Sequence, residues 1–406
     1  MERGYRHIGR WFLSGMWMLL LMLTACASDQ TEVILKEKPV LKLYLFAPTN
    51  PIVTRADEGE VDASVEENQI NTLDVWVFEK DKSDLVSYTH VEDLIFDAGS
   101  GQKEITMDVS DWFVERSTKP RVDVYVVANV GSCGLNLDIN SSPTDLENAF
   151  IENKGGGEDF FGLTGLSDLT NRIMQVPSEG LPMSGFLKNQ EVTGSAPVFS
   201  VNKNNVKLVR AVSKVRFVFS KSIPDAEPPV ISDLTVSLNS GMLPRQEYLF
   251  LSELYDYPKV RNQSHIPAGT TYEGGTLISI VGNVAINDCT DPSSYSFDGN
   301  IETGQDYEER INLGLGQTDP DLSELGRFYL RESDKQLKGT ITYKANGVQR
   351  AEPVSFSMGS AGDFTRNHTW IVYGYFLGSG DLVLKVVDVK DWTEDENPDD
   401  TKIHNW

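Results

Sequence analysis

Residues that build most catalytic and metal sites are scarce in this sequence. The chain contains three cysteines and five histidines, all scattered, and none of the patterns CxxC, HExxH and GxSxG. It also lacks a P-loop and the glycine-rich dinucleotide fingerprint. Neighbouring carboxylates are frequent, but 60 acidic residues place many of them side by side by chance. The sequence therefore predicts no catalytic residues, no metal site, no cofactor and no enzymatic activity.

Basic residues are also few relative to acidic ones. The chain has 36 lysines and arginines against 60 aspartates and glutamates, which gives a formal net charge of −24. A surface of this sign repels phosphate backbones and anionic lipid headgroups. We therefore expect no nucleic-acid partner and no attachment to a membrane through charge.

Helical periodicity is hard to find, whereas short apolar runs rich in β-branched and aromatic residues recur along the chain. Turn formers, among them 33 glycines and 18 prolines, separate these runs. A length of 406 residues exceeds what one typical core organises. The sequence predicts an all-β fold with two sandwich-like domains, at residues 56–203 and 204–380. The candidate strands are Leu73–Phe78, Asp108–Phe113, Val122–Asn129, Val206–Phe219, Asp233–Leu238, Leu277–Val281, Arg327–Leu330, Lys338–Tyr343, Glu352–Phe356 and Thr369–Phe376.

The apolar stretch near the N-terminus is short for a membrane span. It runs from Trp11 to Ala25 and follows three arginines. The residues Leu23-Thr24-Ala25-Cys26 match a bacterial lipobox, in which small residues precede the cleaved bond and the cysteine thiol is acylated. We predict a lipoprotein signal peptide at residues 1–25 and lipidation of Cys26, for instance with palmitate. An ordinary signal peptide, in which Cys26 is incidental, is the alternative. The lipidated precursor would be held at the outer membrane of a diderm bacterium.

The other two cysteines, Cys133 and Cys289, fall in different predicted domains. In an oxidising compartment these two cysteines could form a disulfide, although we expect two buried free thiols. Their spacing does not select between the two states.

Near the predicted mature N-terminus, the run Val40–Phe46 has the alternation of a strand, with Leu41, Leu43 and Leu45 on one face. The acidic segment that follows, Asp57–Asn68, has no aromatic residue and is expected to be an exposed loop. Arg55 stands just before this segment and would suit a trypsin-like protease. Simple solvation of Arg55 is the alternative.

A second run of this kind lies near the C-terminus, at Asp381–Trp392. Its apolar positions alternate and then change phase by one residue, which predicts a β-bulge near Val386–Val387. Such a strand either pairs within its own sheet or is inserted into the sheet of another copy of the chain. The residues that carry the alternation and its change of phase are Leu382, Leu384, Val386, Val387 and Val389, and Trp392 ends the run.

Several short motifs in this order resemble the fimbrillin (type V pilin) family of Bacteroidota, and in particular its major fimbrial shaft subunits. The resemblance extends over most of the chain. The matching segments are the lipobox at Cys26, Thr54-Arg55-Ala56, Leu73–Phe78, Val126–Asn129, Pro182–Gly185, Leu208–Val215, Arg366–Trp370 and Val389–Trp392.

The resemblance implies two tandem transthyretin-like β-sandwich domains and a non-enzymatic, structural function in a pilus that supports cell adhesion. It implies that an arginine-specific protease cuts between Arg55 and Ala56 and so removes a propeptide, residues 26–55. The first strand would leave with the propeptide. The C-terminal segment of another copy, residues 381–406, would fill the vacated groove by donor-strand exchange, and the product would be an extracellular fimbrium.

The partners implied are other copies of the chain and accessory pilins, whereas the receptor on a host or bacterial surface is left open. A tip subunit would be cleaved without donating a strand, and this alternative remains. A different alternative is a monomeric surface lipoprotein that binds a glycan or a host protein through residues 255–275 and 286–325; a hydrolase is a distant third. The aromatic residues available to such a binding site are Tyr255, Tyr257, Tyr272, Tyr295 and Tyr307.

Overall fold

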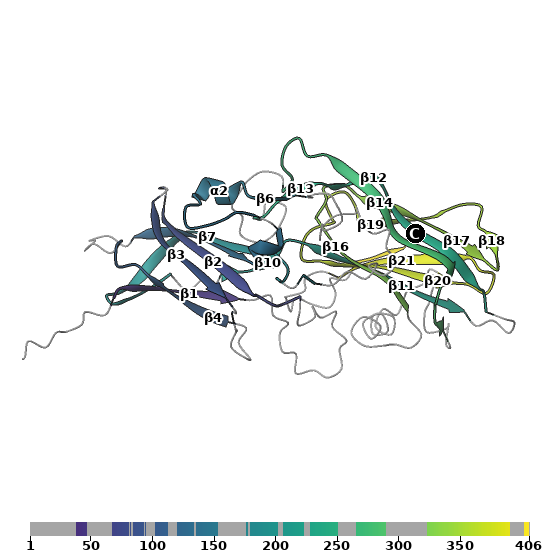
Figure 1. The fold of residues 1–406 in the computed structure, drawn as a ribbon, viewed down its shortest axis with the longest axis horizontal. Helices are drawn as coiled ribbons and strands as arrows, with labels where there is room; N and C mark the ends of the chain where they lie inside the picture. Colours follow the sequence, from purple (N-terminus) through teal and green to yellow (C-terminus); the bar gives the residue numbers. More distant parts are fainter. Residues whose placement is uncertain are drawn as a thin grey trace, which may run out of the picture. The chain divides into compact units, whose positions relative to one another are not determined.

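The computed structural model describes the residues from which all structural statements below are made. These are residues 38–46, 67–80, 82, 84–92, 94, 102–112, 120–133, 135–152, 176–177, 179–201, 206–222, 228–250, 265–289, 323–389 and 402–405. Apart from Lys38, they belong to a single compact unit, Pro39–Trp406. This unit consists almost entirely of β-strands, which confirms the predicted all-β fold class (Figure 1).

The first group of strands forms a sheet with the order β3-β2-β5-β7-β8-β1-β4, to which β9 and β10 add short pairings. Its strands are β1 (Val40–Phe46), β2 (Thr72–Glu79), β3 (Leu85–Glu92), β4 (Gln102–Asp108), β5 (Arg121–Ala128), β7 (Met183–Ser195), β8 (Val198–Val201), β9 (Val206–Lys207) and β10 (Val209–Arg210). A 3-10 turn, Val130–Cys133, and the short helix α2, Pro143–Glu147, follow β5.

Strand β7 joins the two layers of this first group. Its first part pairs with β5, where Met183 lies opposite Ala128, and its second part pairs with β8, where Val192 lies opposite Val201. The residues between the layers form one hydrophobic cluster, in which Trp76 of β2 and Tyr125 of β5 are fully buried. We call this set of residues the first core.

The second group of strands forms two sheets. One has the order β15-β11-β20-β21-β22 with β16 beside β11, and the other has the order β14-β12-β17-β18 with β19 beside β17. The first of these sheets contains β11 (Ser213–Ser222), β15 (Asp288–Cys289), β16 (Ser323–Leu330), β20 (Thr369–Phe376), β21 (Leu382–Val389) and β22 (Lys402–Asn405). The other contains β12 (Ile231–Pro244), β14 (Tyr272–Asn283), β17 (Leu337–Ala345), β18 (Val348–Gln349) and β19 (Val354–Met358).

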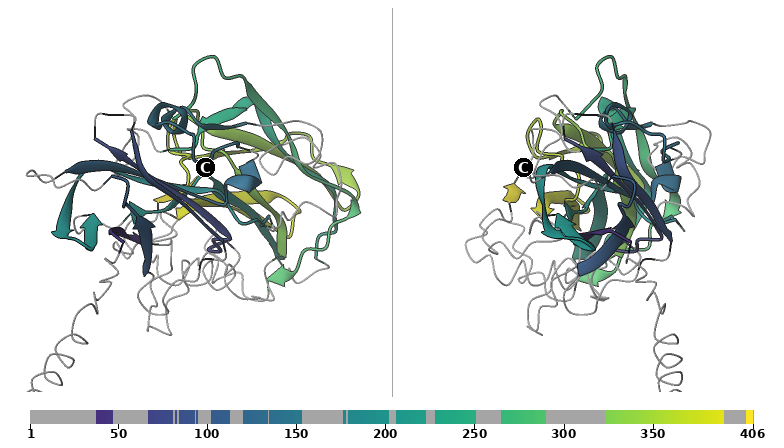
Figure 2. Two further views of the ribbon diagram at one scale, coloured as in Figure 1. Left: turned by 60° about the vertical axis from the view of Figure 1, so that its left-hand side comes forward. Right: turned by 90° about the vertical axis from the view of Figure 1, so that its left-hand side faces the viewer.

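These two sheets enclose a second hydrophobic cluster, which we call the second core. Strand β20 lies at its centre, since all eight of its residues are buried and both of its edges are paired, in parallel with β11 and antiparallel with β21. Gly374 allows this close packing, because a Cβ at that position would lie 2.3 Å from the ring of Phe219. Figure 2 shows the strands of both groups from two further sides.

A short crossing connects the two cores. After β12, strand β13 (Gln246–Tyr248) pairs with β6 (Phe150–Glu152). The next residues enter the first core, where the ring of Phe250 lies 5.6 Å from that of Tyr125, centroid to centroid. Residues from the middle of the predicted C-terminal domain therefore complete the first core. The predicted boundary at residues 203/204 stays a prediction.

Several of the local predictions are wrong. The segment Asp57–Asn68 was expected to be an exposed loop, but its residue Glu67 is 1% exposed. Asp108–Phe113 was expected to be a strand, but β4 ends at Asp108 and residues 110–112 form a turn, in which the Asp108 carboxylate accepts hydrogen bonds from Ser110. The bulge near Val386–Val387 is absent, because β21 pairs with β20 in unbroken register from Leu382 to Val389. The change of phase in the sequence therefore places apolar residues on both faces of a regular strand.

Candidate functional site

The candidate site is the position of β1 within the sheet of the first core. Strand β1 runs antiparallel to β4 along its whole length, from Val40 opposite Asp108 to Phe46 opposite Gln102. On its other side it runs parallel to β8 and then to β9. Both edges of β1 are therefore hydrogen-bonded, and we call the space that it fills the β1 slot.

One face of β1 is part of the first core. Leu41, Leu43 and Leu45 are 0%, 1% and 0% exposed. Their alternation predicted a strand, and the resemblance to fimbrillins implied that this strand is displaced. Removing β1 would uncover the apolar floor of the slot and leave the facing edges of β4 and β8 without hydrogen-bond partners.

The other face of β1 is polar and centred on Glu104 of β4. One oxygen of the Glu104 carboxylate lies 2.8 Å from Lys42 Nζ, and the other accepts a hydrogen bond of 2.8 Å from the Tyr44 hydroxyl. These hydrogen bonds, Lys42 first, hold the pKa of Glu104 below its ordinary value. Because the group faces solvent, it contributes much less to holding β1 than the three leucines do.

The chain beyond Phe46 lies outside the described residues until Glu67. The predicted cleavage site, Arg55–Ala56, falls in this interval, and the predicted lipidation site, Cys26, also lies outside the described residues. The same holds for Trp392 and for the side chains of Cys133, Cys289, Val387 and Val389, although the backbones of these last four are described.

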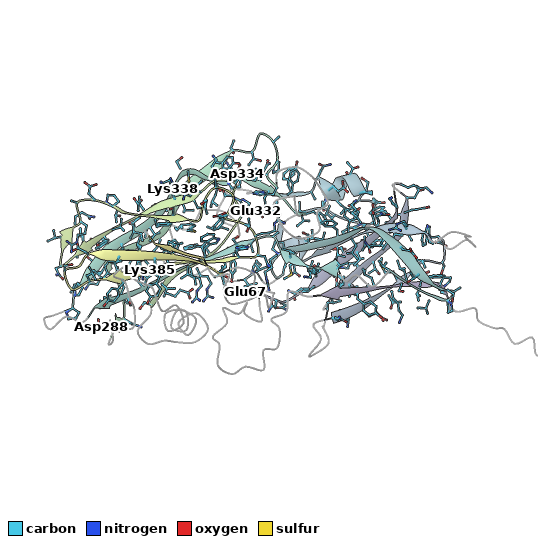
Figure 3. The ribbon with its side chains drawn as sticks, turned by 180° about the vertical axis from the view of Figure 1, so that it is seen from behind. Glu67, Asp288, Glu332, Asp334, Lys338 and Lys385 are labelled. Carbon is cyan, nitrogen blue, oxygen red and sulfur yellow. The ribbon has the colours of Figure 1, made fainter. Side chains whose placement is uncertain are left out.

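The predicted donor strand forms β21, which is paired within its own sheet in this chain. Leu382, Leu384 and Val386 are 8%, 6% and 0% exposed and belong to the second core. The outer edge of β21 is paired with β22, from Lys385 opposite Asn405 to Asp388 opposite Lys402 (Lys385 is labelled in Figure 3). Of the two fates that the sequence allowed, the isolated chain shows the intramolecular one.

The aromatic residues proposed for a glycan-binding face are largely outside the described residues; Tyr272 is the described one. Its hydroxyl donates a hydrogen bond of 2.8 Å to Asp334, and Lys335 Nζ lies 3.5 Å from the centroid of its ring. A lysine therefore covers one face of the Tyr272 ring.

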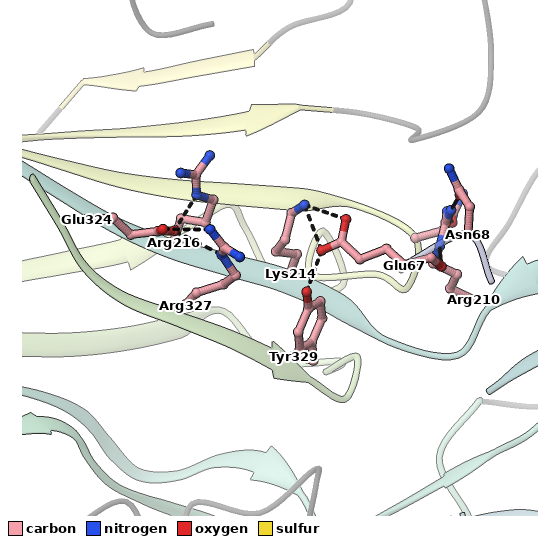
Figure 4. A network of polar contacts seen from close by, with 9 residues as sticks. Glu67, Asn68, Arg210, Lys214, Arg216, Glu324, Arg327 and Tyr329 are labelled. Atoms are coloured by element: carbon pink, nitrogen blue, oxygen red, sulfur yellow. Dashed lines mark hydrogen bonds and ion pairs between the residues drawn. The ribbon is translucent and has the colours of Figure 1, made fainter. Parts of the chain in front are cut away.

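Sequence reasoning missed a buried ionic network between β11 and β16 (Figure 4). The Glu67 carboxylate lies 2.9 Å from Lys214 Nζ through each of its oxygens and also accepts a hydrogen bond from the Tyr329 hydroxyl. Further along the same two strands, Glu324 lies 2.6 Å from Arg216 Nε and 2.7 Å from Arg327 Nη2. The available signal was the presence of Lys214 and Arg216 in an otherwise apolar run, because buried cations require buried anions.

A second buried network lies beside the β13–β6 crossing. Arg366 donates hydrogen bonds to the Glu332 carboxylate and to the backbone oxygens of Tyr248 and Leu249 (Glu332 is labelled in Figure 3). Glu247 accepts a hydrogen bond from the Glu332 backbone, and burial raises the pKa of its carboxyl to about 8. Burial lowers the pKa of His265 to about 3. These acids and the histidine are all fully buried and out of reach of a substrate, which indicates a structural role and not a catalytic one.

Among the described residues, no three side chains of the metal-binding types come together as a metal site. Within the same part of the chain, no helix has the length and apolar character needed to cross a membrane.

The fold and the site define a class: an all-β protein in which a strand near the N-terminus, β1, is buried in a sheet with strands that come much later in the chain. Residues 42–214, from β1 into β11, match the sequence model of the family described as major fimbrial subunit protein (FimA). The match covers less than half of the chain, and it confirms the resemblance to fimbrillins. It supports a fimbrial, adhesin-like subunit of an extracellular surface fimbrium.

The chain is also similar to solved structures. A fimbrial assembly protein from Parabacteroides distasonis is 14% identical, with 90% of this chain and 98% of that chain covered and a TM-score of 0.42. A fimbrilin (fimA) from Porphyromonas gingivalis is 11% identical, with coverages of 85% and 92% and a TM-score of 0.40. The tip fimbrial protein Mfa3 from the same species, truncated at its C-terminus, is 12% identical, with coverages of 91% and 100% and a TM-score of 0.38. No curated protein matches the sequence.

Proposed function

We propose that this protein is a structural fimbrial subunit that polymerises when proteolysis releases β1 and a segment of another copy takes its place. The observation that carries the proposal is the combination of burial and connection at β1. Its leucines are in the core, yet its covalent link to β2 is the long segment between Phe46 and Glu67, which contains Arg55. A cut after Arg55 would leave β1 held by noncovalent contacts alone.

The cut matters because of effective concentration. While β1 is tethered, it competes for the slot at roughly millimolar effective concentration, which a separate chain does not match. Burial of three leucines contributes roughly 1.5–3 kcal/mol each, and each edge hydrogen bond adds about 1 kcal/mol. These contributions are not altered by the cut; only the tether is lost. A second strand of similar composition would then be able to replace β1.

The replacement strand would come from the C-terminal segment of another copy, since the chain offers there a second run with the same alternation. A contact between one end of a subunit and a different surface of the next is heterologous and does not close on itself. Repetition of such a contact gives a fibre. The other expected partners are accessory pilins and an arginine-specific protease, with a precursor lipidated at Cys26. We propose no enzymatic function.

The position of β21 bears on the choice of donor. Transfer of β21 would remove Leu382, Leu384 and Val386 from the second core, so burial in the slot would replace an equal burial in the second core. Transfer of β22 alone would leave these three side chains in place, since β22 is bonded to the rest of its sheet through β21 alone in the described strand order. The donor is therefore either β21, as the sequence predicts, or the tail beyond it.

Cysteine cross-linking between copies distinguishes the two donors. Thr106 of β4 faces β1 across the slot, opposite Lys42. In a chain whose Cys133 and Cys289 are replaced by alanine, so that the proposed lipidation site Cys26 is kept, Thr106→Cys is combined with Val383→Cys or with Ile403→Cys. A ladder of disulfide-linked multimers from the first pair identifies β21 as the donor, and a ladder from the second pair identifies the tail. The absence of both ladders from assembled fibres would exclude occupation of the slot by a C-terminal segment.

The trigger is tested with Arg55→Ala. The variant is expected to stay a monomer, whereas wild-type fibres should carry Ala56 at their N-terminus by mass spectrometry. Arg245→Ala is the matched control, since Arg245 is a half-exposed arginine beside Glu273 and far from the slot. Normal fibres from Arg55→Ala would defeat the proposal, and an acylated monomer as the native form would favour the surface-lipoprotein alternative.

A further inference from the structure

The segment directly after the proposed cleavage interval is held by unusually well-buried polar contacts. Glu67, the first described residue after that interval, is 1% exposed although it carries a charge. Its carboxylate forms the two 2.9 Å contacts with Lys214 Nζ and accepts the hydrogen bond from the Tyr329 hydroxyl (Figure 4). Both partners belong to the sheet of the second core, in β11 and β16.

A buried arginine holds the backbone at the same place. Arg210 Nε donates a hydrogen bond of 3.0 Å to the Glu67 backbone oxygen, and Arg210 Nη2 donates to the side chain of Asn68. Arg210 is itself 0% exposed and is oriented by a 3.1 Å hydrogen bond from Nη1 to Asn367. The segment is therefore fastened through its main chain as well as through the Glu67 side chain.

Asn129 also binds this segment. It follows β5 and has a left-handed backbone conformation, with φ 55°. Its side chain accepts hydrogen bonds from the backbone nitrogens of Asn71 and Thr72, at 2.9 and 3.3 Å, and donates to the backbone oxygen of Gln69, at 2.9 Å. Gly180 makes room for this side chain, because a Cβ there would lie 2.3 Å from Asn129 Nδ2. Glu67–Thr72, which we call the anchor segment, is thus bound at nearly every residue before β2 continues.

The anchor segment and β1 lie on opposite sides of Arg55 in the sequence and are held by different elements. β1 pairs with β4, β8 and β9, whereas the anchor segment is bound by residues near β5, β10, β11 and β16. We propose that the anchor segment retains the new N-terminal end of the mature chain, so that a cut after Arg55 frees β1 and leaves β2 in place, and that Glu67 is its positioning residue. This inference rests on the proposed function.

The physical reason is that a cut creates a new chain end close to a core strand. Chain ends fray unless they are tied down, and fraying would next reach β2, whose residues Trp76 and Val77 are fully buried. A buried ion pair resists such fraying steeply, because the first step of opening separates two charges in a low-dielectric interior. The contacts of Glu67 therefore confine the effect of proteolysis to one side of the cut.

The test compares cut and uncut chains, because a merely structural role affects both alike. Glu67→Gln removes the charge and keeps the shape, and hydrogen exchange is followed at residues 67–79 before and after digestion of the purified monomer with an arginine-specific protease. In the uncut chain, exchange should stay within about threefold of wild type, since β1 still restrains the segment from the other side. In the cut chain, exchange at residues 67–72 should be faster by about tenfold or more.

Glu324→Gln is the matched control. It breaks the ion pairs with Arg216 and Arg327 on the same two strands, at a site outside the anchor segment. It should change exchange at residues 67–72 equally, or not at all, in cut and uncut chains. If Glu67→Gln leaves the chain unfolded, the double variant Glu67→Gln/Lys214→Met removes the uncompensated lysine and is measured in the same way.

The proposal for the anchor segment would be wrong if Glu67→Gln accelerated hydrogen exchange at residues 67–72 equally in cut and uncut chains. It would also be wrong if exchange were accelerated in neither. The proposed function fails by a different result: the peptide that contains β1 remains in fibres assembled from cut wild-type protein, which mass spectrometry of the fibres detects. Since the exchange measurement uses cut monomers and needs no polymer, the two failures are distinguishable.

Discussion

Two strands of this chain are alike in composition and differ in how they are connected. β1 and β21 each place three aliphatic side chains in a core, with exposures of 0%, 1% and 0% in β1 and of 8%, 6% and 0% in β21. β21 follows β20 through the tight turn Leu377–Asp381, in which the Leu377 nitrogen donates to the Asp381 oxygen at 2.8 Å. β1 has no such neighbour in sequence, because its pairing partners β4, β8 and β9 come much later in the chain.

The comparison teaches that burial does not distinguish an exchangeable strand from a permanent one. A strand joined by a tight turn returns to its partner after any opening, because the closure of a short loop is fast and costs little entropy. A strand joined by a long segment depends on that segment to stay intact. Proteolysis therefore acts on β1 selectively, even though β1 is as deeply buried as β21.

Deletion of residues 381–406 is the change with the largest expected effect. The deletion removes both candidate donor segments, so it should abolish polymers and leave the N-terminal strands folded. The structure adds that β21 belongs to the second core, so the sheet around β20 should unfold as well. Circular dichroism and limited proteolysis should show loss of the C-terminal strands, whereas deletion of residues 390–406 should leave them folded. Retention of a folded second core without β21 would contradict its assignment as a core strand.

Truncation of single leucines sharpens the comparison. Leu384→Ala should lower the free energy of unfolding by about 2–5 kcal/mol whether or not the chain is cut, since β21 stays in place. Leu43→Ala should cost a similar amount in the uncut chain and nothing in assembled fibres, from which β1 has left. Chemical denaturation of uncut monomers and thermal melting of fibres measure the two effects. A Leu43→Ala effect that persists in fibres would show that β1 is retained.

A pH effect is expected from the network beside the β13–β6 crossing. Burial raises the pKa of Glu247 from its ordinary value of 4.5 to about 8, so the folded chain binds more protons than the unfolded chain between these values. Stability from this group is therefore present at low pH and lost as the pH rises towards 8. His265, with its pKa lowered to about 3, has the opposite effect, but only below its ordinary value of 6.5.

Glu247→Gln should therefore raise the melting temperature at pH 8 and change it less at pH 6.5. The pKa of the Arg366 guanidinium is raised further by the charges of Glu332 and Glu247, so Arg366 stays charged throughout this range and does not produce the difference. Scanning calorimetry of wild type and variant at the two pH values measures it. A variant that is destabilised equally at both would mean that Glu247 is ionised in the folded chain.

The smallest expected effect is at the polar face of β1. Glu104→Gln weakens the contacts with Lys42 and Tyr44, and a substitution at such a surface position should change stability by less than about 0.5 kcal/mol. Its effect should instead appear as a modestly faster release of β1 after cleavage, followed by native mass spectrometry. A change as large as that of Leu43→Ala would mean that polar contacts, not the leucines, hold β1.

The sequence was sufficient for elements whose pattern is local. The alternation of Leu41, Leu43 and Leu45 predicted β1. Features that depend on distant pairing were not predictable in this way. Nothing local indicates that β7 serves two layers or that Glu67 meets Lys214, because their partners are set by the fold. Val206–Phe219 was expected to be one strand and is divided into β9, β10 and β11.

The neighbours of β1 have one more consequence. Since β1 is antiparallel to β4 and parallel to β8, the two walls of its slot run in opposite directions. Any strand placed between them meets one parallel and one antiparallel wall, whichever way it points. In either orientation, a strand in the slot therefore forms one parallel and one antiparallel pairing, so backbone hydrogen bonding does not select its direction. The polarity of an assembled filament must come from side-chain fit and from how far the incoming segment reaches from its own subunit.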